Sequence, residues 1–322
     1  MWNICGVTLN PGEKKQVMLE PGVKGYQIPA TLICGKKPGK TLLVTAGIHA
    51  GEYPGVAAVI RLAAEMDPSR VEGNLLFMHC VNTSGFWART VEIVPEDGYN
   101  LNRDYPGREE GTTGEKIAYY FMTELFPYVD FIFDFHSGAN TEIMTPLVFY
   151  TNAEKVKEAS YEAAKALDLA YLVESEATKG QYSYAAHHYD VPGLLVEIGH
   201  SHSCHPEWVE LYYRNMKLLL QHLGICQFGE RKTVENQTVH KKVVYLDAAE
   251  QGLWYPAVTA RQKVKKGQLL GHAEDFFGNK TKSYYAEEAA YPSYDRGCFC
   301  SFLYSAFCGG PGLQCEDRRP SL

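Results

Sequence analysis

The sequence lacks any apolar run that approaches the roughly 20 residues needed to cross a bilayer. Its first six residues have neither the basic start nor the apolar core of a signal peptide. Positive charge is also in deficit: 31 Lys and Arg oppose 38 Asp and Glu, for a net charge of −7. That balance argues against a nucleic-acid or membrane-surface protein. These absences predict a cytoplasmic protein with neither a nucleic acid nor a membrane as its partner, and no pattern indicates an oligomeric state.

A regular cysteine framework is also missing. The nine cysteines are odd in number and irregularly spaced, unlike a set of structural disulfides. Cys34 and Cys80 lie inside apolar runs, where a free thiol packs as a small hydrophobe. A reducing compartment fits this usage. The 322 residues, 45% apolar and 21% charged, have an ordinary globular composition with room for one large domain or two smaller ones.

Apolar strands alternate with amphipathic helices over the first two thirds of the chain. This alternation is typical of an α/β fold with a mostly parallel sheet covered by helices on both faces. Ligands of such sheets bind beyond the carboxyl ends of the strands. The sequence predicts strands at 41–46, 74–81, 129–135, 147–150 and 193–199, and helices at 54–66, 113–125, 154–167 and 207–223.

Polar side chains follow the ends of three of these strands. His49 and Glu52 come after strand 41–46, across a turn at Gly47, and His136 follows strand 129–135 directly. Glu197 lies near the end of strand 193–199. Because parallel strands end at one edge of a sheet, we expect these four side chains to lie close together.

His49, Glu52 and His136 form the ligand set that a catalytic zinc ion requires: three protein ligands and an open position for water. Bound zinc lowers the pKa of that water and polarises a carbonyl. Glu197 is the candidate general base, with a buried salt bridge as its alternative role. Asp134 either orients His136 or faces the surface.

The long segment 97–107 contains a candidate clamp for the substrate. Arginine binds a carboxylate through two parallel hydrogen bonds, so we assign Arg103, with Asn102 beside it, to a substrate carboxylate. Arg89 is a second candidate, for that carboxylate or for the oxyanion of the reaction. Each arginine has a surface salt bridge as its alternative role.

Two other histidine clusters are also candidate metal or substrate sites. Residues 200–205 hold three histidines and a cysteine, but they follow Glu197 and precede a helix. They are therefore predicted to form a loop at the mouth of the same site. Contacts to the substrate are one alternative role for this loop, and a separate metal site is a less favoured one. His187 and His188 are assigned to a solvated helix end.

The chain resembles the succinylglutamate desuccinylase/aspartoacylase family of the zinc carboxypeptidase group. Four motifs carry the resemblance, over residues 15–275: 47–52 around His49, the Asn102-Arg103 pair, 134–138 around His136, and 196–199 around Glu197. It implies a carboxypeptidase-like fold with a mixed eight-stranded sheet flanked by helices, one zinc ion per chain on His49, Glu52 and His136, and Glu197 as the base. It also implies that Arg103 binds a carboxylate, with help from Arg89.

We expect two domains: a zinc hydrolase domain at 1–232 and a smaller, all-β, barrel-like domain at 233–322. From about residue 288 the sequence departs from the family pattern, and we see neither the glycine turn nor the two closing strands expected there. We interpret this end as a non-native tail from a shifted reading frame, with a divergent native tail as the alternative.

These features predict a zinc-dependent hydrolase that cleaves the amide bond of an N-acyl amino acid or similar small carboxylate, using water on the zinc and a glutamate base. A metallocarboxypeptidase acting on short peptides would use the same groups. A non-catalytic binding protein of the same fold is disfavoured because the ligands and the base are all present. The acyl group and the amino acid are not encoded in any pattern that we can read.

Overall fold

The computed structural model describes residues 1–138, 142–200, 202–241, 243–247 and 252–287, together with residue 289 and the short segments 291–292, 294–296 and 304–308. The chain divides into two compact units, Met1–Val239 and His240–Leu322. The boundary that we predicted lies seven residues earlier. Residues 233–239 belong with the first unit because the backbone N–H groups of Thr233 and Val234 donate to Asp168, and that of Thr238 donates to Ala170.

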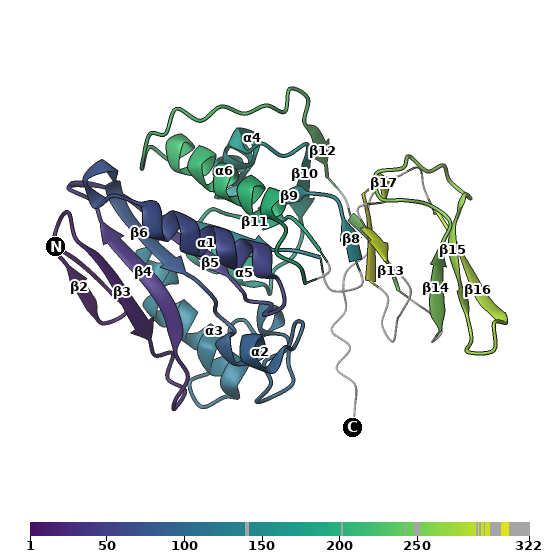
Figure 1. The fold of residues 1–322 in the computed structure, drawn as a ribbon, viewed down its shortest axis with the longest axis horizontal. Coiled ribbons are helices and arrows are strands. Elements are labelled where there is room, and N and C mark those ends of the chain that lie inside the picture. Colours follow the sequence, from purple (N-terminus) through teal and green to yellow (C-terminus); the bar gives the residue numbers. More distant parts are fainter. Residues whose placement is uncertain are drawn as a thin grey trace. The chain divides into compact units, whose positions relative to one another are not determined.

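A mixed sheet forms the centre of the first unit (Figure 1). Within the described residues it has nine strands, in the order β12-β10-β9-β11-β7-β5-β6-β4-β3. The resemblance implied eight. The sheet therefore has one strand more than that, and its edge strand β12 is only three residues long. The bounds are β3 Lys14–Leu19, β4 Ile28–Cys34, β5 Lys37–Ala46, β6 Glu72–Met78, β7 Phe131–His136, β9 Leu147–Thr151, β10 Tyr171–Ser175, β11 Gly193–Glu197 and β12 Thr238–His240.

Four neighbouring strands, β6, β5, β7 and β11, run parallel. Their register brings the three strands with polar ends level with one another. Ala46 of β5 pairs with Phe135 of β7, and His136 pairs with Glu197 of β11. The expectation that these ends share one edge of the sheet is therefore confirmed. The two strands that flank this parallel block, β9 beside β11 and β4 beside β6, run antiparallel to those neighbours, which makes the sheet mixed.

The parallel strands are buried on both faces, as their continuous apolar runs predict. Leu42 and Val44 of β5 belong to one core, and Leu43 between them belongs to the other. The first core includes residues of α1 (Tyr53–Glu65), α4 (Lys157–Ala166) and α6 (Pro206–His222). The second includes residues of α3 (Thr113–Glu124) and α5 (Gln181–Tyr189). Helices thus cover both faces (Figure 1).

Several elements lack a strong signal in the sequence. Strand β10 and the short helix α2 (Thr83–Ala88) were not predicted, and the long segment 97–107 contains a 3-10 turn, η2 (Leu101–Arg103). A six-residue helix and a five-residue strand give too few repeats for periodicity to reveal them. Two short strands, β1 (Trp2–Ile4) and β2 (Val7–Leu9), form a separate N-terminal hairpin.

The described part of the second unit is all-β. Its strands β14 (Leu253–Pro256), β15 (Leu269–Glu274) and β16 (Lys280–Tyr285) form an antiparallel sheet. A second sheet joins β13 (Val243–Asp247), β19 (Tyr304–Cys308) and β17 (Tyr291–Pro292). We expected no strands beyond residue 287, so β17 and β19 correct that reading. Most of the predicted non-native tail lies outside the described residues.

Within the described residues, no helix is long and apolar enough to cross a membrane. The described cysteines are free thiols, and both Cys34 and Cys80 are buried.

A glycine controls how closely the helix that follows the ligand turn approaches the sheet. Gly55 of α1 faces Phe135 of β7, and a Cβ atom at Gly55 would lie 2.9 Å from the Phe135 Cβ. Gly55→Ala should therefore lower the free energy of unfolding by about 1–3 kcal/mol through overpacking, although alanine favours helices. Urea unfolding measures the change. Ile60→Ala, at a half-exposed position of the same helix, is the control, and a stabilised Gly55→Ala variant would contradict this packing argument.

Candidate metal centre and active site

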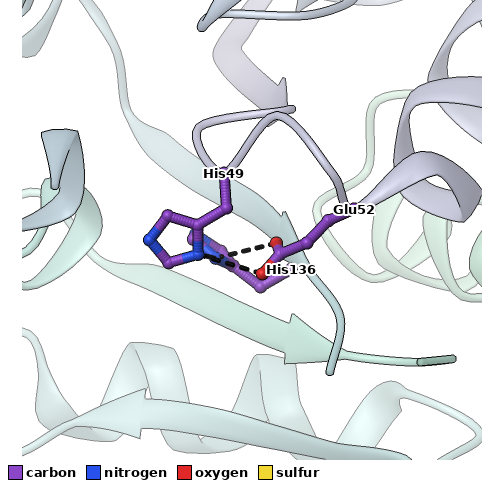
Figure 2. A group of neighbouring side chains, drawn as sticks. All are labelled: His49, Glu52 and His136. Carbon is purple, nitrogen blue, oxygen red and sulfur yellow. Dashed lines mark hydrogen bonds and ion pairs between the residues drawn. The ribbon is translucent and has the colours of Figure 1, made fainter. Parts of the chain in front are cut away.

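The ligand turn begins where β5 ends. Gly47 has a φ of +65°, and a Cβ there would lie 2.8 Å from Cys80 Sγ, so the backbone conformation and the tight packing both require glycine. The chain then reverses into α1, with Glu52 at the N-cap position and Pro54 in the first turn. This turn places the imidazole of His49 and the carboxylate of Glu52 on the same side, above the end of β7 (Figure 2).

Three side chains converge at this point, as predicted. His49 Nδ1 lies 2.9 Å from Glu52 Oε1, and His136 Nδ1 lies 3.1 Å from Glu52 Oε2. The two Nδ1 atoms are 3.2 Å apart. All three potential ligand atoms lie within 4.8 Å of one another. Within the described residues this is the one group of three or more histidine, cysteine or acidic side chains arranged in this way.

The outer nitrogen of each imidazole is held by an oxygen acceptor. His49 Nε2 lies 3.1 Å from Asn100 Oδ1, and His136 Nε2 lies 3.1 Å from Asp134 Oδ2. Each acceptor favours a proton on Nε2 and leaves the Nδ1 lone pair directed toward the other ligands. Asp134 is therefore an orienting group, and its alternative role at the surface is excluded because its side chain is fully buried.

The charges of the cluster compensate one another. Burial on its own would raise the pKa of Glu52, but the neighbouring His49 and His136 outweigh it and hold this pKa below its usual range. Burial likewise opposes the charged form of His136, but Asp134 and Glu52 raise its pKa well above the ordinary value. A metal ion would replace the proton, since ligating imidazoles must be neutral. Two imidazoles and a carboxylate are donors that suit zinc.

Glu197 is directly opposite His136 in the parallel pairing of β11 and β7. Paired residues of adjacent strands project from the same face of a sheet, so Glu197 shares the face of His136. Its side chain is half-buried. The neighbouring hydroxyl of Tyr212 from α6 accepts from the Ile198 N–H and donates to the His136 carbonyl. This residue, which the sequence analysis missed, ties the two strand ends together.

The residues assigned to substrate binding have different surroundings. Asn102 is buried, and its Oδ1 accepts from the backbone N–H of Gln181 at 2.8 Å, one of the donors that the start of helix α5 leaves open. Arg103 is exposed, and its guanidinium donates only to the Asn102 carbonyl among the described residues. Arg89 is exposed at the C-cap of α2, with a φ of +58°, and forms no ion pair with the described residues. A role in substrate binding stays a prediction for all three.

Gln181 connects this loop to the metal ligands. In the orientation that satisfies its neighbours, its side-chain amide donates to Asp134 Oδ2 at 2.8 Å. Thr45 Oγ1 donates to the other oxygen of Asp134 at 2.7 Å. The buried Asp134 carboxylate thus has three partners, which offset the cost of its burial.

The histidine-rich loop 200–205 does not form a second metal group within the described residues. It packs against the ligand turn instead: a Cβ on Gly51 would lie 2.6 Å from His202 Nε2. Trp208 holds the loop in place through ring contacts with His200 and His205. The loop thus lies next to the ligand turn, and its position at the mouth of the site stays a prediction. His187 and His188 lie in the last turn of α5, as expected of a helix end.

Comparison with known proteins defines the family. A sequence profile of the succinylglutamate desuccinylase/aspartoacylase catalytic domain matches residues 38–223, more than half of the chain. The chain belongs to this family.

Individual relatives agree with the family assignment. The chain is 28% identical over 258 residues to an N-alpha-acetyl-L-2,4-diaminobutyric acid deacetylase from Halomonas elongata, covering 77% of this chain and 74% of the relative. A product-bound structure of the ectoine utilization protein EutE (DoeB) from Ruegeria pomeroyi has a TM-score of 0.77 at 27% identity, over 88% of this chain and 87% of that one. A succinylglutamate desuccinylase/aspartoacylase from Rhodobacter sphaeroides has a TM-score of 0.83 at 19% identity, over 96% and 99% of the two chains, and shows the shared fold.

Sequence reasoning missed four residues that support the site: Asn100, Gln181, Thr45 and Tyr212. Asn100 carried the strongest signal, because it lies in the same turn-rich loop as Asn102 and Arg103. Its side chain accepts from the Asn102 backbone N–H at 2.9 Å, which is the short-range bond that asparagine forms in turns. Gln181 and Tyr212 reach the site from elements distant in the sequence. Thr45 lies on β5 just before the ligand turn, but its partner Asp134 is on another strand, so no local pattern marks these three residues.

The bond between Asn100 and His49 generates a prediction about metal binding. Asn100→Ala removes the acceptor that orients the His49 ring, so zinc affinity should fall about 10- to 100-fold. Asn100→Asp keeps an acceptor and should retain most of the affinity. Competition with a fluorescent chelator measures both.

Asn3→Ala, at an exposed position in the N-terminal hairpin, is the matched control. Equal zinc affinity of Asn100→Ala and the control would show that Asn100 does not orient the ligand.

Proposed function

We propose that this protein is a zinc-dependent deacylase that hydrolyses the amide bond of an N-acyl amino acid. The observation that carries the proposal is the convergence of His49, Glu52 and His136, with the outer ring nitrogens held by Asn100 and Asp134. Family membership and the N-acetyl-diaminobutyrate deacetylase among the relatives support an amide as the bond that is cleaved.

His49, Glu52 and His136 would hold one zinc ion through the two Nδ1 atoms and the carboxylate. When bound, zinc lowers the pKa of a water molecule and polarises the carbonyl of the scissile amide. Glu197 is proposed to take a proton from the attacking water and to deliver it to the leaving nitrogen. Its pairing opposite His136 supports this role, because it places the carboxylate on the face that carries the ligands.

Arg103 is proposed to bind the carboxylate of the substrate, and Arg89 to assist at that carboxylate or at the oxyanion. The exposure of both guanidinium groups and the lack of an ion pair to either among the described residues leave them available to an anion. Asn102 would act beside Arg103 by fixing the loop, since its Oδ1 is already bonded to the start of α5.

The physiological substrate is then a small N-acyl amino acid in solution, and we propose a cytoplasmic setting for the reaction. The N-acetylated diamino acid of the Halomonas elongata relative is the first compound to test. Metallocarboxypeptidase activity on short peptides would need the same zinc, base and arginine, so dipeptides belong in the same panel of substrates.

Glu197→Gln separates catalysis from metal binding. The amide is isosteric with the carboxylate but cannot accept a proton, so kcat should fall about 10²- to 10⁴-fold with zinc content unchanged. Release of free amine from N-acetyl amino acids measures turnover, and atomic absorption measures zinc. Retained turnover in Glu197→Gln would refute the proposal. So would wild-type protein that contains no zinc when purified and shows no activity after zinc is added.

Arg103→Ala tests the carboxylate clamp. Loss of the bidentate contact should raise KM for carboxylate substrates about tenfold or more, while zinc content remains that of the wild type. The matched control is Arg108→Ala, because Arg108 is exposed in the same region but is paired with Glu115. A KM that is unchanged in Arg103→Ala would remove this residue from the substrate site.

A further inference from the structure

The first two turns of helix α6 pack against the end of strand β11, directly beyond the proposed base. Trp208 and Tyr212 are four residues apart, so their side chains leave the same face of the helix. The Trp208 ring meets Gly199, where a Cβ atom would lie 2.7 Å from the ring atom Cε3. One turn later, the Tyr212 hydroxyl accepts from the Ile198 N–H at 3.0 Å. The helix therefore holds the two residues that follow Glu197.

The same hydroxyl also bonds to the backbone of a predicted metal ligand. Tyr212 donates to the carbonyl of His136, which accepts from the Ile198 N–H as well, at 3.2 Å. Because His136 and Glu197 are paired across β7 and β11, the hydroxyl lies where the ligand strand and the base strand end together. One side chain thus fixes the backbone of the ligand and the backbone next to the base.

The Tyr212 hydroxyl has no proton to spare for the reaction itself. A phenol donates one proton, and here the His136 carbonyl receives it. Burial, together with the carboxylates of Glu197 and Glu52, raises the pKa of Tyr212 well above its ordinary value, so the proton stays on the hydroxyl. The ring packs on Phe135 with centroids 4.7 Å apart, and successive strand residues such as Phe135 and His136 point to opposite faces. Tyr212 therefore reaches the strand ends from the face opposite the metal group.

We infer that Tyr212 is a positioning residue for the reaction, which sets the Glu197 carboxylate relative to the ligand His136. The inference rests on the deacylase function proposed above and adds to it a residue that acts through the base. Glu197 is the last residue of β11 and its side chain is half-buried, so its position depends on the strand end that carries it. Gly199, with a φ of +86°, turns the chain away two residues later, and Tyr212 holds the residue between them. A catalytic group displaced by about 1 Å can lose about 10²-fold in rate.

Tyr212→Phe removes the hydroxyl and keeps the ring that packs on Phe135. In zinc-loaded protein assayed with N-acetyl amino acids, kcat per bound zinc should fall about 10- to 100-fold, while KM and zinc content stay close to those of the wild type. Tyr213→Phe is the matched control, because Tyr213 is the next residue of α6 and its hydroxyl donates to Glu65 of α1 instead. The kcat of this control should equal that of the wild type.

A double-mutant cycle with Glu197→Gln separates positioning of the base from a general loss of structure. If the hydroxyl acts through Glu197, adding Tyr212→Phe should change kcat by less than about twofold once the carboxylate is absent. A purely structural effect would lower the kcat of Glu197→Gln by the same factor as that of the wild type, and this result overturns the inference. A kcat of Tyr212→Phe equal to that of Tyr213→Phe also overturns it, even where the deacylase function stands.

A measurement without turnover keeps the two proposals distinguishable. In protein labelled with ¹³C at its glutamate carboxyl groups, the Glu197 resonance is identified by its loss in Glu197→Gln. Tyr212→Phe should shift this resonance, and Tyr213→Phe should leave it in place. If the zinc-loaded wild type hydrolyses no N-acyl amino acid, the deacylase proposal fails, and the resonance alone decides whether Tyr212 sets the position of Glu197. A Glu197 resonance that is unchanged in Tyr212→Phe overturns the inference.

Discussion

The structure of the site depends on one requirement: two imidazoles and a carboxylate are brought within 4.8 Å of one another in a place largely closed to water. Such a group is stable only if its charges and hydrogen-bonding atoms are compensated. The carboxylate of Glu52 lies against the Nδ1 atoms of both imidazoles. Asn100 and Asp134 provide oxygen acceptors for the Nε2 atoms of His49 and His136. The surrounding fold provides these partners from three separate segments of the chain: the turn after β5, the loop at residue 100, and β7.

The hydrogen bonds around the ligands link metal binding to the predicted substrate loop. One chain of bonds starts at His136 and runs through Asp134 and Gln181 to Asn102. A second chain starts at His49 and runs to Asn100, whose side chain also accepts from the Asn102 backbone N–H. Asn102 therefore connects both histidines to the segment that presents Arg103. Because the loop and the ligands share these bonds, the geometry of the two is set together.

The parallel register of β5, β7 and β11 is the scaffold for this arrangement. It aligns Ala46 with Phe135 and His136 with Glu197, so that residues up to 148 positions apart in the sequence reach the same edge. Gly47 and Gly55 supply the local freedom that this requires: one allows the turn after β5, and the other lets α1 approach β7. The second unit contributes a separate all-β body whose own sheets pair in antiparallel fashion.

Much of the first unit could be predicted from its sequence, because buried parallel strands and amphipathic helices leave strong periodic patterns. The polar residues His49, Glu52, His136 and Glu197 were recognisable since each interrupts or ends an apolar run at a strand terminus. The predictions failed where elements are short, as in α2, β10 and β12, and where a boundary depends on contacts, as for residues 233–239, which bond to Asp168 and Ala170.

The sequence by itself determined which groups could bind a metal and on which edge of the sheet they would lie, because residue type and strand order are local properties. Only the tertiary structure decided how those groups are held. The pairing of Asn100 with His49, the three bonds to Asp134 and the bond from Asn102 to the start of α5 all depend on groups from distant segments meeting within about 3 Å, the distance of a hydrogen bond. No spacing along the chain encodes such distances, so they emerge only when the strands and loops are packed together.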